Sequence, residues 1–305
     1  VAGVVPELGV FDLPFLFNSE KEADQLLDGK VGDWFNAKMP AAGLINLAWW
    51  ENGFRHMTNS KRPVNRLEDF SGIKMRVMQN KIYIDTFNTL GTNAVPLAFS
   101  EVYSALETKT VDAQENPFLN IQNMKFYEVQ KYLTLTKHSY SPNMLLFSKK
   151  VWDGLSTQEQ AVLKECAAQG RDVQRKINRE QSDASVAFFK SHGMQVNEIS
   201  PAEMTRIRER TKVIYEQEYA AGQAAEEARS LILRASRAQT QLLTATTAAE
   251  RDTLGAAIET SLAEIAKRLD IIKDLSDSEE TAVTSQQLID AMGIWTKRQR
   301  AYIAL

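Results

Sequence analysis

The order of apolar and polar positions divides the chain near residue 200. Before that point, short apolar runs of the kind found in buried strands alternate with helical patterns. Strands are predicted at residues 42–50, 72–78, 111–114, 132–136 and 144–148. Since strands that alternate with helices favour parallel pairing, this part is predicted to be α/β with largely parallel sheets.

Long helices are predicted after these strands. Ser156-Thr-Gln-Glu159 is a capping box, which satisfies free backbone amides at a helix start, and the helical pattern runs from there to about Lys190. Ser200-Pro201-Ala-Glu203 is a second capping box with proline at the first helical position. Its helix can continue to about residue 245.

The last part of the chain has the pattern of a helical hairpin. Capping boxes at 247–250 and 276–279 precede two further helices. The first of them carries an apolar seam spaced by three and four residues: Leu254, Ile258, Leu262, Ile265, Leu269, Ile272 and Leu275. Such a helix needs neighbours to bury its seam, either within the chain or in a second copy, so self-association through residues 227–305 is one expectation.

Composition and charge narrow the function classes. The net charge is −3, with 36 basic and 39 acidic residues, which argues against nucleic acid as a partner. The one cysteine, Cys166, excludes an internal disulfide and is expected to be a small buried apolar residue of a helix. The longest nearly uncharged apolar stretch, residues 41–50, is half the length of a membrane span. Residues 1–17 lack the basic start of a signal peptide and are expected to come from the middle of a protein.

Catalytic motifs are absent from the sequence. It has no glycine-rich phosphate loop, no His-Glu-x-x-His and no Gly-x-Ser-x-Gly. The three histidines, His56, His138 and His192, are scattered and are expected at the surface or in turns, so no metal site is predicted. The chain is therefore predicted to be a non-enzymatic protein without a cofactor.

One arginine stands out. In a strand at 72–78, alternate residues share a face, so Ile73, Met75 and Val77 form an apolar face while Arg76 lies on the other. Periodicity leaves two interpretations open. Arg76 is either a surface arginine with a buried stem or an arginine facing a cleft, where its planar fork can bind a carboxylate through two hydrogen bonds.

Several ordered blocks carry a family resemblance. They are Phe11–Phe17, Gly72–Met78, Pro96–Leu106, Val111–Pro117 and Phe126–Tyr132. Over about residues 1–220, their residues and spacing resemble the periplasmic substrate-binding proteins of TRAP transporters, of the dicarboxylate and sialic-acid type.

The resemblance implies a fold and a role. It implies a two-lobed periplasmic-binding-protein fold over residues 1–226 that closes on an organic anion. The second lobe is expected at about 54–141, the first at about 1–53 and 142–155, and long helices at about 156–226. It further implies a periplasmic protein that delivers a small organic carboxylate to membrane-embedded TRAP transporter subunits.

The resemblance also implies five ligand-binding residues. Arg76 corresponds to the family's main binding arginine and Arg55 to a second ligand-contacting arginine. Asn116 corresponds to a hydrogen-bonding contact, Phe99 to an aromatic wall, and Gln79 to a position where an amide often touches the ligand. Arg55 could instead pair with a carboxylate at the hinge, Phe99 could be a core aromatic, and Gln79 could have no contact with a ligand.

Two departures from the family are expected. The β-α-β unit that normally precedes the block at 11–17 is missing, so the first lobe is predicted to be incomplete. The tail, at residues 234–275 and around 295–302, resembles the periplasmic four-helix-bundle sensor domain of bacterial chemoreceptors. This resemblance adds an alternative function, that of a ligand-sensing ectodomain. The tail could instead be a generic amphipathic hairpin or a dimerising coiled coil, and the chain could join parts of two genes.

Overall fold

A computed structural model describes residues 4–242 and 244–275 of the chain. Contacts divide it into two units, Val1–Ile214 and Tyr215–Leu305, and each unit has its own buried apolar cluster. The predicted boundary after residue 226 stays a prediction, because both positions lie within one helix, α8 (Pro201–Leu242).

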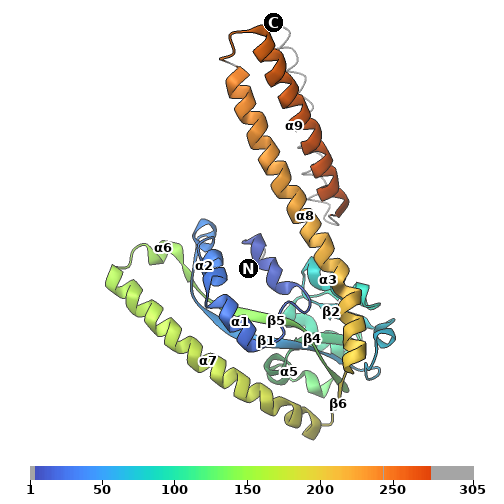
Figure 1. Cartoon of the computed structure of the whole chain (residues 1–305). Helices are drawn as coiled ribbons and strands as arrows, with labels where there is room; N and C mark the ends of the chain where they lie inside the picture. Colours follow the sequence, from blue (N-terminus) through green and yellow to red (C-terminus); the bar gives the residue numbers. More distant parts are fainter. Residues whose placement is uncertain (1–3, 243, 276–305) are drawn as a thin grey trace. The chain divides into compact units, whose positions relative to one another are not determined.

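The first unit is built on one mixed sheet of six strands in the order β3-β2-β4-β1-β5-β6 (Figure 1). Strand β1 pairs antiparallel with β4 and β5, whereas β2 is parallel to β3 and β4, and β6 is parallel to β5. The strands are β1 (Leu44–Asn59), β2 (Lys74–Val77), β3 (Asn93–Pro96), β4 (Ala113–Pro117), β5 (Tyr132–Ser148) and β6 (Gln195–Glu198). The α/β prediction is confirmed. Three of the five strand pairings are parallel, as expected, but the longest pairing, between β1 and β5, is antiparallel, and so is that of β1 with β4.

Strand β5 is continuous, although two separate strands were expected on either side of Pro142. Pro142 lies opposite Glu51 of β1, next to a shift in the pairing register between Glu51 and Gly53. Gly53 adopts a φ of 104°, which favours glycine. The missing N–H of proline is tolerated at such an irregularity, so the strand passes through it.

Helices surround the sheet and complete the described part of both units. The helices are η1 (Pro6–Asp12), α1 (Glu20–Leu27), α2 (Lys30–Asn36), η2 (Met39–Ala42), η3 (Leu67–Phe70), α3 (Lys81–Thr89), η4 (Phe99–Glu101), α4 (Val102–Glu107), α5 (Phe118–Asn123), η5 (Phe126–Glu128), α6 (Lys149–Trp152), α7 (Thr157–Ser191), α8 and α9 (Ala248–Leu275). In the part of the chain that the structure describes, no helix is both long and apolar enough to cross a membrane.

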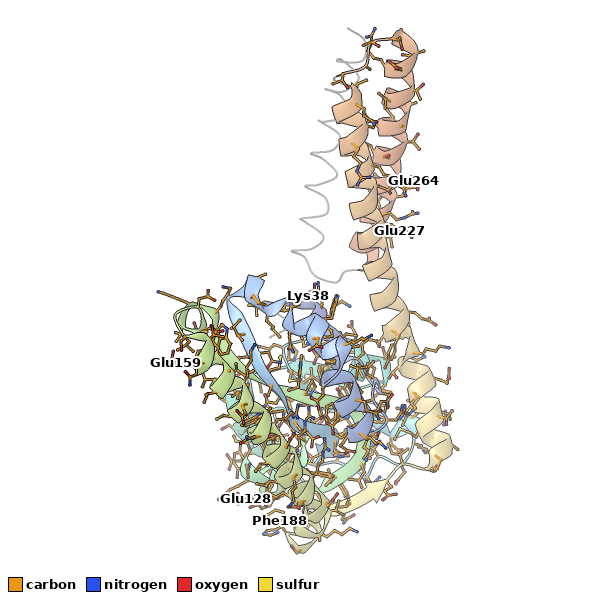
Figure 2. All side chains as sticks on the ribbon, turned by 60° about the vertical axis from the view of Figure 1, so that its left-hand side comes forward. Lys38, Glu128, Glu159, Phe188, Glu227 and Glu264 are labelled. Atoms are coloured by element: carbon orange, nitrogen blue, oxygen red, sulfur yellow. The ribbon has the colours of Figure 1, made fainter. Side chains whose placement is uncertain are left out.

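The predicted capping boxes at 156–159 and 247–250 are present. At 200–203 only half of the box forms, because the Glu203 amide donates to Ser200 Oγ at 3.4 Å while the Glu203 carboxylate accepts from the Leu67 amide. Ser156 Oγ accepts a hydrogen bond from the Glu159 amide at 3.3 Å, and the Glu159 carboxylate accepts one from the Ser156 amide at 2.7 Å. Figure 2 shows Glu159 and Phe188 near opposite ends of α7. The same reciprocal pair joins Thr247 and Glu250 at the start of α9. The capping box expected at 276–279 lies outside the described residues.

Charged side chains join α7 to the rest of the first unit. Arg175 donates to Asp28, the C-cap residue of α1, at 2.6 Å and to the Trp49 carbonyl of β1 at 2.6 Å. Arg179 donates to Glu51, whose side chain is almost fully buried. Because each arginine carries several fixed donors, α7 is tied at once to α1 and to β1.

Three sequence-based expectations of burial are wrong. Cys166 is exposed, because it lies on a face of α7 that borders a surface groove. His56 and His138 are only 2% exposed, whereas they were expected at the surface or in turns. His56 stacks on Phe118 with ring centroids 4.2 Å apart, and His138 bonds to Glu115, so packing from distant elements covers both rings.

In the second unit, α9 packs against residues of α8. Leu254, Ile258, Leu262 and Ile265 lie in the buried or partly buried cluster of this unit, which confirms that part of the predicted seam. Arg268 of α9 pairs with Glu227 of α8 and with Glu264 on its own helix, and Figure 2 shows both glutamates along the hairpin. Self-association and the resemblance to a sensor bundle stay predictions.

Candidate functional site

A buried ion pair joins the two central strands of the first unit. Arg55 of β1 donates from Nη2 to Glu115 Oε1 of β4 at 2.8 Å, and from the same nitrogen to the Glu115 carbonyl at 2.9 Å. The side chains of Arg55 and Glu115 are 3% and 0% exposed. The antiparallel register places Arg55 opposite Pro117, so the arginine reaches back along β4 to the glutamate.

The pair holds both groups in their charged forms. Burial on its own would lower the pKa of Arg55, but the Glu115 carboxylate outweighs it and raises the pKa. Burial would likewise raise the pKa of Glu115, but Arg55 and a hydrogen bond from His138 lower it below its ordinary value. The charge of Arg55 is therefore already balanced within the protein.

One more hydrogen bond joins Arg55 to strand β5. Its Nη1 donates to Ser141 Oγ of β5 at 3.2 Å. His138, also on β5, bonds to Glu115 at 2.9 Å and to Thr136 at 2.8 Å. Burial lowers the pKa of His138, so its ring is neutral near pH 7.

Arg76 has a different environment from Arg55. It is 2% exposed, and its Nε and Nη2 both donate to the Leu97 carbonyl, at 2.9 and 2.6 Å. Its Nη1 is buried and has no hydrogen-bond partner among the described residues, which also supply no carboxylate to pair with it. Burial lowers the pKa of Arg76. Arg76 therefore has no carboxylate at ion-pair distance among the described residues, and the charge of Glu115 acts on it only from farther away.

A cavity of about 480 Å³ is lined by Ser141, the partner of Arg55, and by Met78 and Gln79, which follow Arg76 in the chain, but not by either arginine itself. Its walls come from η1, from the segment after β2, and from the middle of β5. The polar lining residues are Asp12, Gln79, Asn80, Ser141 and Asn143. Ser141, the partner of Arg55, connects the cavity to the ion pair.

The structure brings some of the predicted site residues together. Arg55 donates to Asn116 Oδ1 at 3.2 Å, and the Asn116 amide also bonds to Gln114 and Asn120. Gln79 is exposed and lines the cavity. Phe99 is 41% exposed, with its ring centroid 6.2 Å from that of Phe126, and no contact joins it to the other four.

Sequence reasoning missed four polar residues around the cavity. Glu115 balances Arg55, and His138 and Ser141 bond to this pair. Asp12 lines the cavity and accepts a hydrogen bond from Asn80. The available signal was a charged residue inside an otherwise apolar block, as Asp12 is within 11–17. Glu115 carried no such signal, because its block at 111–117 also contains Asp112.

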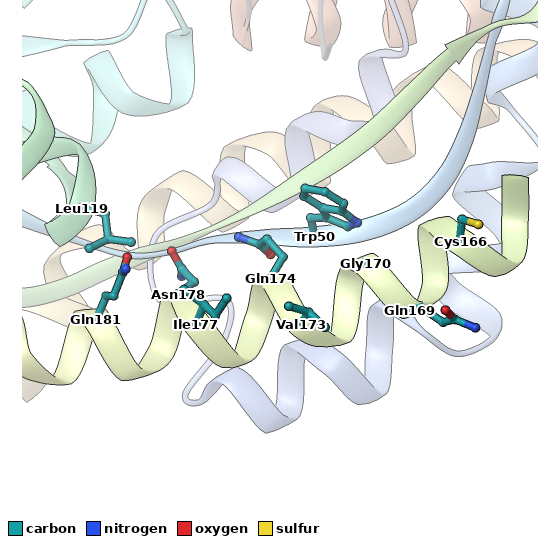
Figure 3. A pocket seen from close by; sticks show the side chains of 10 residues that line it. All are labelled: Trp50, Leu119, Cys166, Gln169, Gly170, Val173, Gln174, Ile177, Asn178 and Gln181. Carbon is teal, nitrogen blue, oxygen red and sulfur yellow. The ribbon is translucent and has the colours of Figure 1, made fainter.

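A second hollow lies along α7 and contains none of the predicted residues. Figure 3 shows this groove, in which Trp50 of β1 faces a row of side chains on α7 that includes Cys166, Val173 and Ile177. Within residues 4–242 and 244–275, no group of three or more histidine, cysteine or acidic side chains could hold a metal ion.

A family model matches the whole of the first unit and a little beyond it. The model, described as DctP, bacterial extracellular solute-binding protein, family 7, matches residues 1–222. The 2,3-diketo-L-gulonate-binding periplasmic protein of Escherichia coli is 42% identical over 195 residues, which are 64% of this chain and 60% of that protein. The chain spans about 60% of the length of the first curated relatives it matches.

Solved structures resemble the chain over a similar or greater length. A sugar acid binding protein of Advenella mimigardefordensis, solved in complex with galactonate, is 41% identical with a TM-score of 0.69, and the match covers 90% of this chain and 76% of that one. A TRAP periplasmic solute binding protein of Polaromonas sp. JS666, bound to D-erythronate, is 40% identical with a TM-score of 0.64 and coverages of 70% and 75%.

Proposed function

Because the chain belongs to the bacterial extracellular solute-binding protein family 7, we propose that it binds a small organic acid and delivers it to membrane-embedded TRAP transporter subunits. Family membership confirms the resemblance predicted from the sequence blocks, and the solved relatives confirm the two-lobed periplasmic-binding-protein fold class. The relatives are solute-binding proteins rather than enzymes, and this chain is proposed to act in the same way, in the periplasm and without chemistry on its ligand.

The buried guanidinium of Arg76, with one unmade hydrogen bond and no ion-pair partner among the described residues, carries the proposal. A buried guanidinium without a carboxylate partner is costly, and an unmade hydrogen bond at Nη1 adds to that cost. A ligand carboxylate offers both the opposite charge and two acceptor oxygens, which fit the arginine fork. Arg55 is balanced by Glu115 and can serve as a secondary contact, through the Ser141 side of the cavity.

The ligand class follows from the relatives. Two of them are named or solved with sugar acids, galactonate and diketogulonate, and a third holds D-erythronate, a shorter hydroxy acid. We therefore place hydroxylated carboxylates among the first candidates. A panel of such acids, with dicarboxylates and keto acids beside them, can be screened by thermal shift, because a ligand at 100 times its dissociation constant stabilises the fold by about 2.7 kcal/mol.

The deciding experiment replaces the proposed anchor. Calorimetric titration of Arg76→Ala with the best acid of the panel should show roughly a hundredfold weaker binding, since charge-assisted hydrogen bonds contribute about 1.5–3 kcal/mol. Arg76→Lys keeps the positive charge but loses the planar fork of donors, so its affinity for the acid should lie between those of the unaltered chain and Arg76→Ala. Arg66→Ala removes an arginine whose side chain is 66% exposed and serves as the control. Equal affinity of Arg76→Ala and Arg66→Ala would refute the assignment.

A further inference from the structure

The lining of the cavity beside Arg55 carries an unusual charge for a site that binds acids. Among the described residues that line it, Asp12 alone bears a charge, and that charge is negative. The remaining polar lining consists of the side-chain amides of Gln79, Asn80 and Asn143 and the hydroxyl of Ser141. These groups form hydrogen bonds with neutral polar atoms and do not balance a second ligand carboxylate.

Asp12 is held in place by one neighbour. Its Oδ2 accepts a hydrogen bond from Asn80 Nδ2 at 2.7 Å. Asn80 is fixed in turn, because its Oδ1 accepts from the Ile82 amide at 2.9 Å and caps α3. Within the described part of the chain, Asp12 forms no ion pair and its Oδ1 accepts no hydrogen bond. Burial raises the pKa of Asp12, and the more distant charge of Arg55 offsets only part of this effect. Asp12 therefore keeps a free acceptor oxygen while it lines the cavity.

We propose that Asp12 makes this cleft selective for organic acids with one carboxylate and hydroxyl groups toward their other end, and selective against dicarboxylates. This inference rests on the proposed function. A ligand whose carboxylate is anchored by arginine presents its remaining atoms to the cavity lining. A hydroxyl can donate to the free oxygen of Asp12, and a hydrogen bond to a charged group is stronger than one between neutral groups. A second carboxylate would instead meet a like charge in a partly buried place.

The Asp12–Asn80 bond also has a purely structural interpretation, in which it only fastens η1 to α3. The two roles predict different results. If the bond is only structural, its loss should lower the stability of the protein and weaken the binding of all ligands alike. If Asp12 sets selectivity, its loss should change the ratio of the dissociation constants of ligands that differ in charge at one end. The ratio is therefore the quantity to measure.

The test uses matched ligands of four and six carbons. Calorimetric affinities of the chain are measured at about pH 8, above the range of carboxyl pKa values, for D-erythronate, succinate and succinamate, and for galactonate, adipate and adipamate. Succinamate replaces one carboxylate of succinate by a neutral amide of the same shape. The hydroxylated monocarboxylate should bind best, and the amide should bind about tenfold more tightly than the dicarboxylate.

Two variants separate the charge of Asp12 from its position. Asp12→Asn keeps the shape of the side chain but removes its charge. The variant should bind the hydroxylated acid about tenfold more weakly, and it should bind the dicarboxylate and its amide with nearly equal affinity. Asp183→Asn makes the same replacement at an exposed position of α7 and should leave both ratios unchanged. If Asp12→Asn does not fold, as judged by a lost cooperative melt, the comparison of dicarboxylate with amide in the unaltered chain decides alone.

The outcomes distinguish this inference from the proposed function. Equal binding of dicarboxylate and amide by the unaltered chain, or ratios that Asp12→Asn leaves unchanged, would overturn the role of Asp12. If binding is still lost in Arg76→Ala, the proposed function survives that result. Binding of none of the six acids or of the wider panel would overturn the proposed function, and the role of Asp12 with it.

Discussion

Replacement of Glu115 by alanine should destabilise the first unit strongly. Glu115 accepts hydrogen bonds from Arg55 and His138, and both it and Arg55 are almost fully buried. Without the carboxylate, the Arg55 guanidinium keeps its charge in an environment with little water. Its remaining partners, the Glu115 carbonyl, Ser141 and Asn116, are neutral oxygen atoms.

The magnitude follows from the burial of the pair. Removal of one partner of a buried ion pair costs about 3–5 kcal/mol, because the other charge stays desolvated and unbalanced. A domain of this kind is stable by about 5–15 kcal/mol, so the variant should lose a large share of its stability. Arg55→Met combined with Glu115→Ala should be less destabilised than the sum of the single changes, since neither charge then remains.

The assay is denaturant unfolding followed by tryptophan fluorescence. Four of the five tryptophans, Trp34, Trp49, Trp50 and Trp152, lie in the first unit, so the signal reports mainly on that unit. Glu68→Ala is the matched control, because Glu68 also pairs with an arginine, Arg206, but both side chains are about half exposed. Exposed pairs contribute little to stability, so this variant should unfold near the midpoint of the unaltered chain.

The result that would refute the reasoning is a similar shift in the two variants. Equal midpoints for Glu115→Ala and Glu68→Ala would mean that the buried ion pair of Arg55 and Glu115 contributes nothing beyond an exposed pair. A strictly additive double variant would likewise show that Arg55 is not left uncompensated when Glu115 is removed.

Two further predictions concern pH and packing. Burial lowers the pKa of both His56 and His138, so the unfolded chain binds protons that the folded one does not, and the free energy of unfolding should fall as the pH drops from about 7.5 to 5.5; a flat or rising profile over this range would contradict it. Gly32→Ala should lower the stability by about 1–3 kcal/mol in the same denaturant assay, because a Cβ there would lie 1.7 Å from the Leu27 carbonyl oxygen. Gly154→Ala, whose Cβ would lie at an ordinary 3.4 Å from its nearest neighbour, is the control, and equal losses in both would show that the backbone yields freely at residue 32.

Elements with local signals could be predicted from the sequence, and those that depend on distant partners could not. The capping box of Ser156 and Glu159, whose members bond to each other within one turn, predicts the start of α7. The course of β5 through Pro142 depends instead on the irregularity of β1 at Gly53, which is far away in the sequence. A proline in a short apolar run is locally a break, and only the partner strand makes it tolerable.

The same limit applies to the candidate site. Alternation in the strand around Arg76 separated it from the apolar face of Met75 and Val77, and the family resemblance then favoured the cleft. The partners of Arg55 could not be found in this way, because Glu115 lies 60 positions away and reaches it only through the pairing of β1 with β4. A single sequence carries the residues of an ion pair but not their pairing.

The two arginines of the candidate site differ in their partners. Arg55 is buried and paired with Glu115, whereas Arg76 is buried with an unmade hydrogen bond and with no carboxylate at ion-pair distance among the described residues. Under the proposed function, the free energy that the unmade hydrogen bond of Arg76 costs would be recovered when an acid supplies acceptors and the opposite charge. The proposed role of Asp12 on the cavity wall would then limit that gain to ligands with a single negative end.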